Sequence, residues 1–221
     1  MGLRLWMAVL ALAGLFLAFG VGGGAGVTIG SLDARTTYEA SSSVVGLLGI
    51  VLIGMAYIMS LTLPPAATMD QLAGTGRRAA AWFIDFVLSL TTLATLLALI
   101  PLTIEAVATG HFDWRFQRTD VTAGDWVVAF IVVALTLIGM GLYWSLPVMR
   151  GGQTVGQCVM GLRVVPASAD PPSFGRVWVR GMLQPFAGVL WLAKLVTGKY
   201  WHDEFANTKV VRVLDRATAA A

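Results

Sequence analysis

Four long apolar stretches constrain this chain more than any other feature of its sequence. They cover residues 5–22, 44–63, 79–104 and 126–147. Each approaches or exceeds the roughly 20 mainly apolar residues that a helix needs to cross the hydrocarbon core of a bilayer. Of the 221 residues, 57% are hydrophobic and only 12% are charged, whereas soluble domains contain about 25% charged residues. The sequence therefore predicts an all-α membrane protein with four transmembrane helices.

A fifth apolar stretch, residues 177–196, contains Arg180 and Pro185. Proline can break a helix, and arginines near the ends of such a segment can extend to lipid headgroups. We expect an amphipathic or re-entrant helical segment on the cytoplasmic side, although the sequence leaves open that the segment crosses the membrane. The flanking runs 162–165 and 208–213 are rich in β-branched residues, so they predict a small two-stranded β element.

Small residues recur at helical spacing in the first two apolar stretches. Such spacing lets helix backbones approach one another closely in a membrane. We therefore interpret these residues as helix contacts rather than as a ligand site: Gly14, Ala18, Gly22, Gly46, Gly49 and Gly54.

The positions of the basic residues predict the orientation, because cytoplasmic loops of membrane proteins carry an excess of Lys and Arg. If residues 177–196 dip and return, only Arg35, Arg115 and Arg118 of the 15 Lys and Arg residues lie outside. All others then lie within or at the cytoplasmic face. We expect both termini to be cytoplasmic.

A stripe of polar residues in the third apolar stretch begins at Asp85 and continues through Ser89, Thr92 and Thr95. This spacing places them on one face of a helix. A carboxylate at the centre of a membrane helix costs about 2.5–3.5 kcal/mol on insertion scales, so Asp85 needs a partner or a function. Two interpretations stay open, a structural ion pair or hydrogen bond and a cation or proton site. Candidate site residues are Asp85, Ser89 and Thr92.

Arg78 precedes Asp85 by seven positions, which places it on nearly the same helix face and about 10 Å lower along the axis. A direct salt bridge between them would be stretched. Asp203 follows the amphipathic segment on the same side of the membrane and is our candidate partner for Arg78.

Three blocks of sequence carry a family resemblance. The first, residues 77–85, begins with two arginines and ends at Asp85; the second, residues 151–165, contains several glycines; the third, residues 202–211, has an aspartate and a threonine followed by valines. In this order the blocks resemble the RDD family of small bacterial membrane proteins, over about residues 73–213. The resemblance implies that Arg78, Asp85 and Asp203 form the family's charge cluster. Gln157 stands where a basic residue is common in the family.

The resemblance leaves the first two helices as an additional N-terminal hairpin. We expect an N-terminal transmembrane hairpin over residues 1–70, an RDD-type transmembrane hairpin over 71–150, and a cytoplasmic-side region with a dipping helix and a short β pair over 151–221. The implied location is the inner membrane of a bacterium, in a multi-pass arrangement.

Enzyme chemistry finds little support in the residues. The chain has one Cys and two His, without the spacing of a metal site, and its glycine runs lack the Lys and Ser or Thr of a phosphate loop. The net charge of +3 follows from membrane topology rather than from a nucleic-acid groove. We expect no enzyme activity, no cofactor, no catalytic metal and no nucleic-acid partner.

The RDD family is often described as transport proteins, and cation/proton antiport is suggested for some members. The resemblance therefore implies a small transporter or exchanger of monovalent cations or protons that uses an intramembrane aspartate. The alternative is a non-catalytic accessory, assembly or scaffold subunit of a larger membrane complex. Because four helices are few for an autonomous carrier, we expect a homo-oligomer or a subunit of a complex, in contact with the lipid bilayer.

Overall fold

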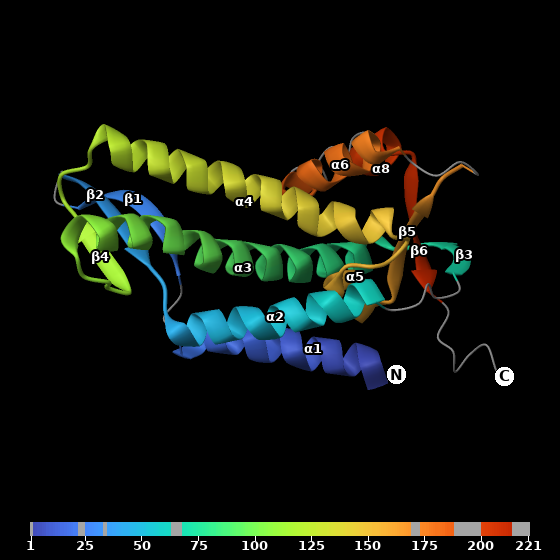
Figure 1. Ribbon diagram of the computed structural model, residues 1–221. Coiled ribbons are helices and arrows are strands. Elements are labelled where there is room, and N and C mark those ends of the chain that lie inside the picture. The colour runs from blue at the N-terminus through green and yellow to red at the C-terminus, as the bar shows by residue number, and fades with distance from the viewer. Residues whose placement is uncertain are drawn as a thin grey trace. The chain divides into compact units, whose positions relative to one another are not determined.

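The computed structural model describes residues 2–21, 25–32, 35–62, 68–168, 173–187 and 200–213. Four helical segments in it are long and apolar enough to cross a membrane (Figure 1). These are α1 (Gly2–Leu15) with its π-helical continuation η1 (Phe16–Val21), α2 (Val44–Thr62), α3 (Thr75–Thr109) and α4 (Ala123–Met149). The predicted set of four transmembrane helices is confirmed, and the chain is an integral membrane protein.

The outer faces of these helices are apolar. Large side chains that would be buried in a soluble bundle are half or more exposed, among them Phe19, Val51, Ile58, Phe83 and Phe130. In a bilayer such side chains meet acyl chains, which are as apolar as the side chains themselves. Lipid contact therefore accounts for exposure that water would not tolerate.

Two compact units divide the described chain, one within residues 1–10, 55–87 and 140–221 and the other within residues 11–54 and 88–139. In the second unit, Gly14 of α1 faces Gly49 of α2. A Cβ atom at Gly14 would lie 2.6 Å from the Gly49 carbonyl oxygen, and one at Gly49 would lie 2.5 Å from the Gly14 oxygen. The small residues predicted as helix contacts therefore include a pair that permits direct backbone approach.

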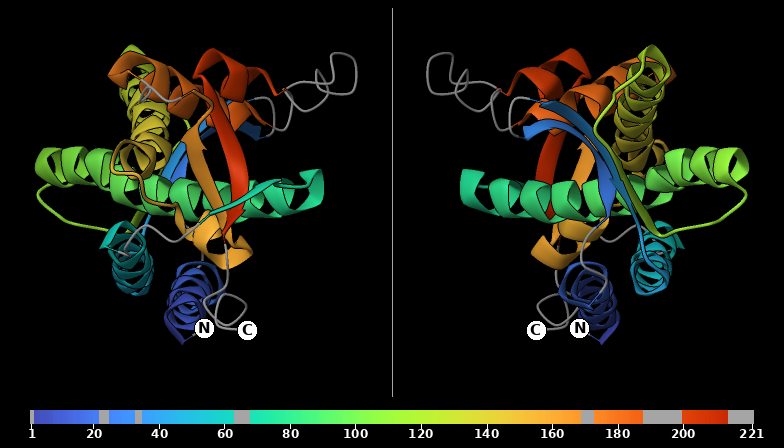
Figure 2. Two further views of the ribbon diagram at one scale, coloured as in Figure 1. Left: turned by 90° about the vertical axis from the view of Figure 1, so that its right-hand side faces the viewer. Right: turned by 90° about the vertical axis from the view of Figure 1, so that its left-hand side faces the viewer.

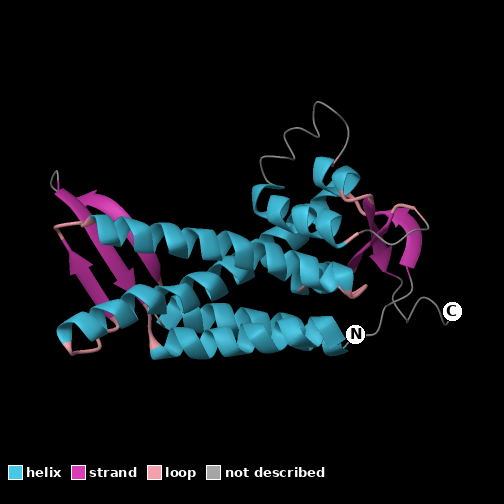
Figure 3. Cartoon of the chain, turned by 45° about the horizontal axis from the view of Figure 1, so that its top comes forward, coloured by secondary structure: helices cyan, strands magenta, loops and turns pink. Residues whose placement is uncertain are grey.

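The second unit also holds a three-stranded antiparallel sheet with the order β1-β2-β4 (Figure 3). Its strands are β1 (Gly26–Leu32), β2 (Arg35–Ser41) and β4 (Arg115–Arg118). This sheet is not predicted from the sequence. Its strands come from two connections that are far apart in sequence, so neither run has its partner nearby.

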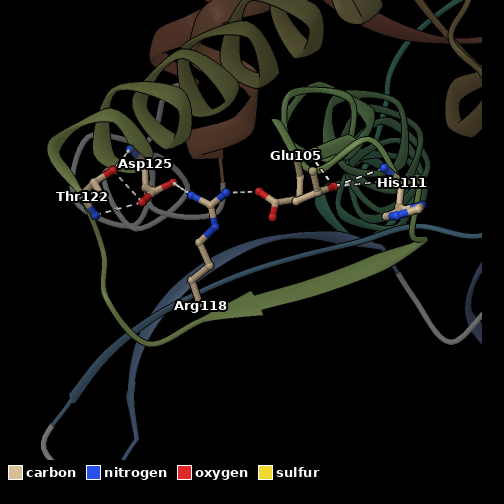
Figure 4. Close-up of polar contacts among 6 residues, drawn as sticks. Glu105, His111, Arg118, Thr122 and Asp125 are labelled. Atoms are coloured by element: carbon tan, nitrogen blue, oxygen red, sulfur yellow. Dashed lines mark hydrogen bonds and ion pairs between the residues drawn. The ribbon is translucent and has the colours of Figure 1, made fainter. Parts of the chain in front are cut away.

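Arg118 at the end of β4 links α3 to α4 within this unit (Figure 4). Its guanidinium donates to Glu105 of α3 and lies 3.6 Å from the Asp125 carboxylate at the start of α4. The same carboxylate accepts hydrogen bonds from the backbone N–H and the hydroxyl of Thr122, each at 2.8 Å. A carboxylate in this position satisfies N–H groups at the start of a helix.

The first unit contains the sheet β3-β6-β5, formed by β3 (Thr68–Leu72), β6 (Thr208–Val213) and β5 (Leu162–Pro166) (Figure 2). The predicted pairing of the last two runs is confirmed, with Val164 opposite Val210. The sheet is larger than the predicted two-stranded element, because β3 pairs with the other edge of β6.

Short helices complete the first unit: α5 (Val155–Met160), α6 (Phe174–Leu183), the 3₁₀ turn η2 (Gln184–Phe186) and α8 (Trp201–Phe205). Helix α6 packs closely on α4, since a Cβ atom at Gly181 would lie 2.5 Å from the Gly141 carbonyl oxygen. The predicted dipping segment, residues 177–196, begins inside α6. Residues 188–196 lie outside the described residues, so the dip remains a prediction.

Candidate functional site

Asp85 of α3 is buried, with 1% of its surface exposed. Its Oδ1 atom accepts hydrogen bonds from the Tyr143 hydroxyl at 2.7 Å and from the Gly156 backbone N–H at 2.8 Å. Its Oδ2 atom accepts from the Thr154 hydroxyl at 2.5 Å. A carboxylate that accepts from three donors has most of its acceptor sites filled, so Asp85 connects α3, α4 and the start of α5.

Thr154 and Gln157 form the capping box that begins α5. The Thr154 hydroxyl accepts from the Gln157 backbone N–H at 3.3 Å, and the Gln157 side-chain oxygen accepts from the Thr154 backbone N–H at 3.2 Å. This reciprocal arrangement satisfies two N–H groups that a helix start otherwise leaves without partners. Gln157 thus has a structural role here.

Gly156 permits the close approach of α5 to α3. A Cβ atom at this position would lie 2.8 Å from Asp85 Oδ2 and would also collide with the carbonyl oxygen of Ala81. Since the Ala81 oxygen belongs to the backbone of α3, it cannot move aside as a flexible side chain could. The glycine therefore lets its own backbone N–H reach the Asp85 carboxylate.

Tyr143 is held in place by a second tyrosine. The ring of Tyr57 stacks on it with a centroid distance of 4.6 Å and an interplanar angle of 21°. The Tyr57 hydroxyl also donates to the Tyr143 carbonyl oxygen at 2.9 Å. Sequence reasoning missed Tyr57, Tyr143 and Thr154, since they come from three separate segments.

Asp203 of α8 accepts from two arginines. Its Oδ2 atom accepts from Arg78, and its Oδ1 atom accepts from Nε and Nη2 of Arg180 at 3.2 and 3.0 Å. The structure thus brings Arg78 and Asp203 together, and it adds Arg180 to them. The expectation that Arg180 extends to lipid headgroups is wrong, because 1% of its side chain is exposed.

Two aromatic side chains complete this charged cluster. The Arg78 guanidinium lies over the Tyr200 ring, 3.6 Å from its centroid. His202 Nε2 lies 3.6 Å from Asp203 Oδ1, and its Nδ1 atom has no hydrogen-bond partner within the described part of the chain. Burial, together with the positive charges of Arg180 and Arg78, lowers the pKa of His202 to about 3. His202 is therefore neutral at physiological pH.

Arg180 keeps its charge despite its burial. Desolvation and the nearby charge of Arg78 lower the pKa of Arg180 to about 9, which is still above neutral pH. Asp203 is the one carboxylate among the described residues that accepts from both guanidinium groups, so the cluster of Arg78, Arg180 and Asp203 carries one excess positive charge. An ionised Asp85 would balance that charge.

A cavity of about 30 Å³ lies between the two groups of residues. Asp85 and Gln157 line it together with Arg78, Arg180 and His202. A buried space needs roughly 10–15 Å³ on this measure, as well as several polar partners, to hold a water molecule. The cavity meets both conditions.

Ser89 and Thr92 follow Asp85 along α3, but neither lines this cavity. The Thr92 hydroxyl donates to the Leu88 carbonyl oxygen of its own helix at 2.8 Å, and Thr95 donates to Thr91 in the same way at 2.9 Å. These threonines satisfy their hydroxyl groups locally, as threonines in helices often do. Ser89 is buried, with 2% of its surface exposed.

Comparison with known proteins gives one positive result. Neither the curated proteins nor the solved structures include a match to the chain. The model of the RDD family matches residues 72–207, more than half of the chain, and this range includes Arg78, Asp85 and Asp203. The additional N-terminal helices α1 and α2 precede the match. The chain belongs to the RDD family.

Proposed function

We propose that this protein is a small proton-coupled transporter of a bacterial inner membrane, with Asp85 as the group that accepts the proton. The cavity beside Asp85 supports this proposal most directly, because ionisable side chains line a space that can hold water. Buried ionisable groups inside membrane helices commonly mark ion or proton pathways.

The surroundings of the cavity favour a proton over a metal cation. Arg78 and Arg180 both line it, and a guanidinium group only donates hydrogen bonds, so neither side chain offers a ligand atom to a metal ion. A proton can be carried by a single water molecule and one carboxylate.

Proton binding at Asp85 would disturb the hydrogen bonds that hold α5 against α3. An ionised carboxylate only accepts hydrogen bonds, whereas a protonated one also donates. The hydroxyls of Tyr143 and Thr154 can rotate to accept, but the backbone N–H of Gly156 can only donate. Protonation of Oδ1 would therefore weaken the contact between Gly156 and Asp85, and this coupling provides a route from proton binding to movement of α5.

The test is a proton-flux assay on the purified protein in liposomes that contain a pH-sensitive dye. We expect an imposed membrane potential to drive proton movement with the wild-type protein. Asp85→Asn should reduce this flux to the rate of empty liposomes, because the amide cannot accept the proton. The exposed Asp113 provides the matched control, so Asp113→Asn should retain the flux. Equal flux in both variants would refute the proposal.

A second candidate function is that of an accessory or assembly subunit in a larger membrane complex. It is favoured by the three donors to Asp85 and by the pairing of Asp203 with two arginines, since such satisfied clusters fix a structure. Purification in mild detergent followed by mass determination separates the two functions. A stable complex with another protein and no flux favours the subunit, whereas a homo-oligomer with flux favours the transporter.

A further inference from the structure

A second cavity, of about 210 Å³, lies in the first unit apart from the site of Asp85. Its apolar wall is formed by Val148 and Met149 at the end of α4, by Val164 and Val165 of β5, and by Val177 of α6. Engineered apolar cavities of roughly 150 Å³ bind molecules such as benzene. This volume therefore accommodates several methylene groups of an alkyl chain.

Arginine provides the polar part of this cavity. Arg163 lines it and donates from Nη2 to the Gly151 carbonyl oxygen at 2.6 Å, which fixes the guanidinium at the wall. Arg150 and Arg176, both exposed, each directly precede a lining residue, Gly151 and Val177. The described residues that line the cavity include no acidic side chain. Its apolar wall and positive border match an amphiphile with an anionic head.

The elements around the cavity place it where lipid headgroups are found. Val148 and Met149 are among the last residues of α4, a helix long and apolar enough to cross a membrane. Helix α6 runs beside these last turns (Figure 3) and combines exposed Phe174 with exposed Arg176. Amphipathic helices of this kind lie at the boundary between headgroups and acyl chains.

We propose that this cavity, defined by Val148, Val165, Val177 and Arg163, binds one anionic phospholipid. Part of an acyl chain occupies the apolar volume, and the phosphate pairs with Arg163. Guanidinium groups suit phosphate because several N–H donors lie in one plane. The site is separate from the cavity beside Asp85, so it does not depend on the proposed transport function.

The experiment is native mass spectrometry of the protein in mild detergent, with phosphatidylglycerol or phosphatidylcholine added as the probe. We expect one phosphatidylglycerol to stay bound at collision energies that strip phosphatidylcholine. Arg163→Ala should weaken retention of phosphatidylglycerol about tenfold, as expected for a lost charge-assisted contact. The matched control is Arg212→Ala on the neighbouring strand β6, which does not line the cavity and should leave retention unchanged.

A second variant tests the apolar part of the site. Val165 is only half-buried, so Val165→Phe can fill the cavity without overpacking the core, and it should also reduce retention. Equal retention of the two lipids by the wild-type protein would overturn the proposal. Undiminished retention of phosphatidylglycerol in both variants would do so as well. Specific retention of added oleate without retention of phosphatidylglycerol would replace the phospholipid with a fatty acid.

Discussion

Asp203 is the residue on which the charged cluster depends most. It accepts hydrogen bonds from Arg78 and Arg180, and both arginines are largely buried. Removal of one partner from a buried ion pair typically costs about 3–5 kcal/mol, because the remaining charge stays in a poorly solvated place. Here a single carboxylate pairs with two arginines, so its removal would leave two buried positive charges without a partner instead of one.

His202 should make the stability of the protein depend on pH. Its pKa is about 3 in the folded protein against about 6.5 in an unfolded chain. Between these values the unfolded chain binds a proton that the folded protein excludes, so the free energy of unfolding falls as the pH falls from 6.5 towards 3. The slope is at most about 1.4 kcal/mol per pH unit. Above pH 6.5 His202 is neutral in both the folded and the unfolded chain, so its titration no longer reduces the free energy of unfolding.

Thermal unfolding in mild detergent, followed by tryptophan fluorescence at pH 8 and pH 5, measures this effect. The wild-type protein should lose stability at pH 5, and His202→Gln should lose less. The exposed His111 is the only other histidine in the sequence, so His111→Gln should behave like the wild type. An unchanged pH response in His202→Gln would show that other groups cause it.

Charge counting along the sequence identified Asp85, Arg78 and Asp203, because a charge in an apolar protein needs a partner wherever it lies. The same reasoning missed the burial of Arg180, since an arginine in an amphipathic segment can equally extend to headgroups. It also missed Tyr143 and Thr154. Their hydroxyl groups look ordinary in a sequence, and only the folded chain brings both to Asp85.

At the level of elements, α5 depends on the absence of a side chain at Gly156. Gly156→Ala would place a methyl group against the Ala81 carbonyl and the Asp85 carboxylate. We expect the variant to lose about 1–3 kcal/mol of stability, the usual cost of overpacking, and to separate α5 from α3. The measurement is the shift in unfolding midpoint in mild detergent.

Gly175 in α6 provides the control for this substitution. A Cβ atom there would meet nothing within 4 Å, and alanine favours a helix over glycine. Gly175→Ala should therefore leave the unfolding midpoint unchanged or raise it slightly. Equal stability of the two variants would mean that α5 does not need its close contact with α3.

The elements themselves were predictable to different extents. The four long helices followed from their apolar length, which the bilayer dictates. Helix α5 has only six residues, too few for a periodic pattern, although its capping pair Thr154 and Gln157 was a usable signal. The sheet β1-β2-β4 could not be assembled from the sequence, because β4 comes from a separate connection after α3.

For the whole molecule, the distribution of basic residues predicts which regions face outward. In a Cys158→Ser background, Thr36→Cys in β2 should react with a membrane-impermeant maleimide in intact spheroplasts. Ala167→Cys, next to β5, should react only after permeabilisation. Both positions are exposed, so accessibility to solvent does not distinguish them. The opposite labelling pattern would reverse the predicted orientation.

The central position of β6 affects how this chain can be made. Strands β3 and β5 both pair with β6, yet the ribosome produces β3 about 140 residues earlier. At typical synthesis rates β3 waits on the order of 10 s for this partner, whereas β5, made about 46 residues before β6, waits a few seconds. Asp203 precedes β6 by only a few residues, so Arg78 and Arg180 also wait for their counter-ion until this moment. Translation that stalls before this point exposes unpaired strand edges and unneutralised arginines, which membrane proteases and chaperones can recognise.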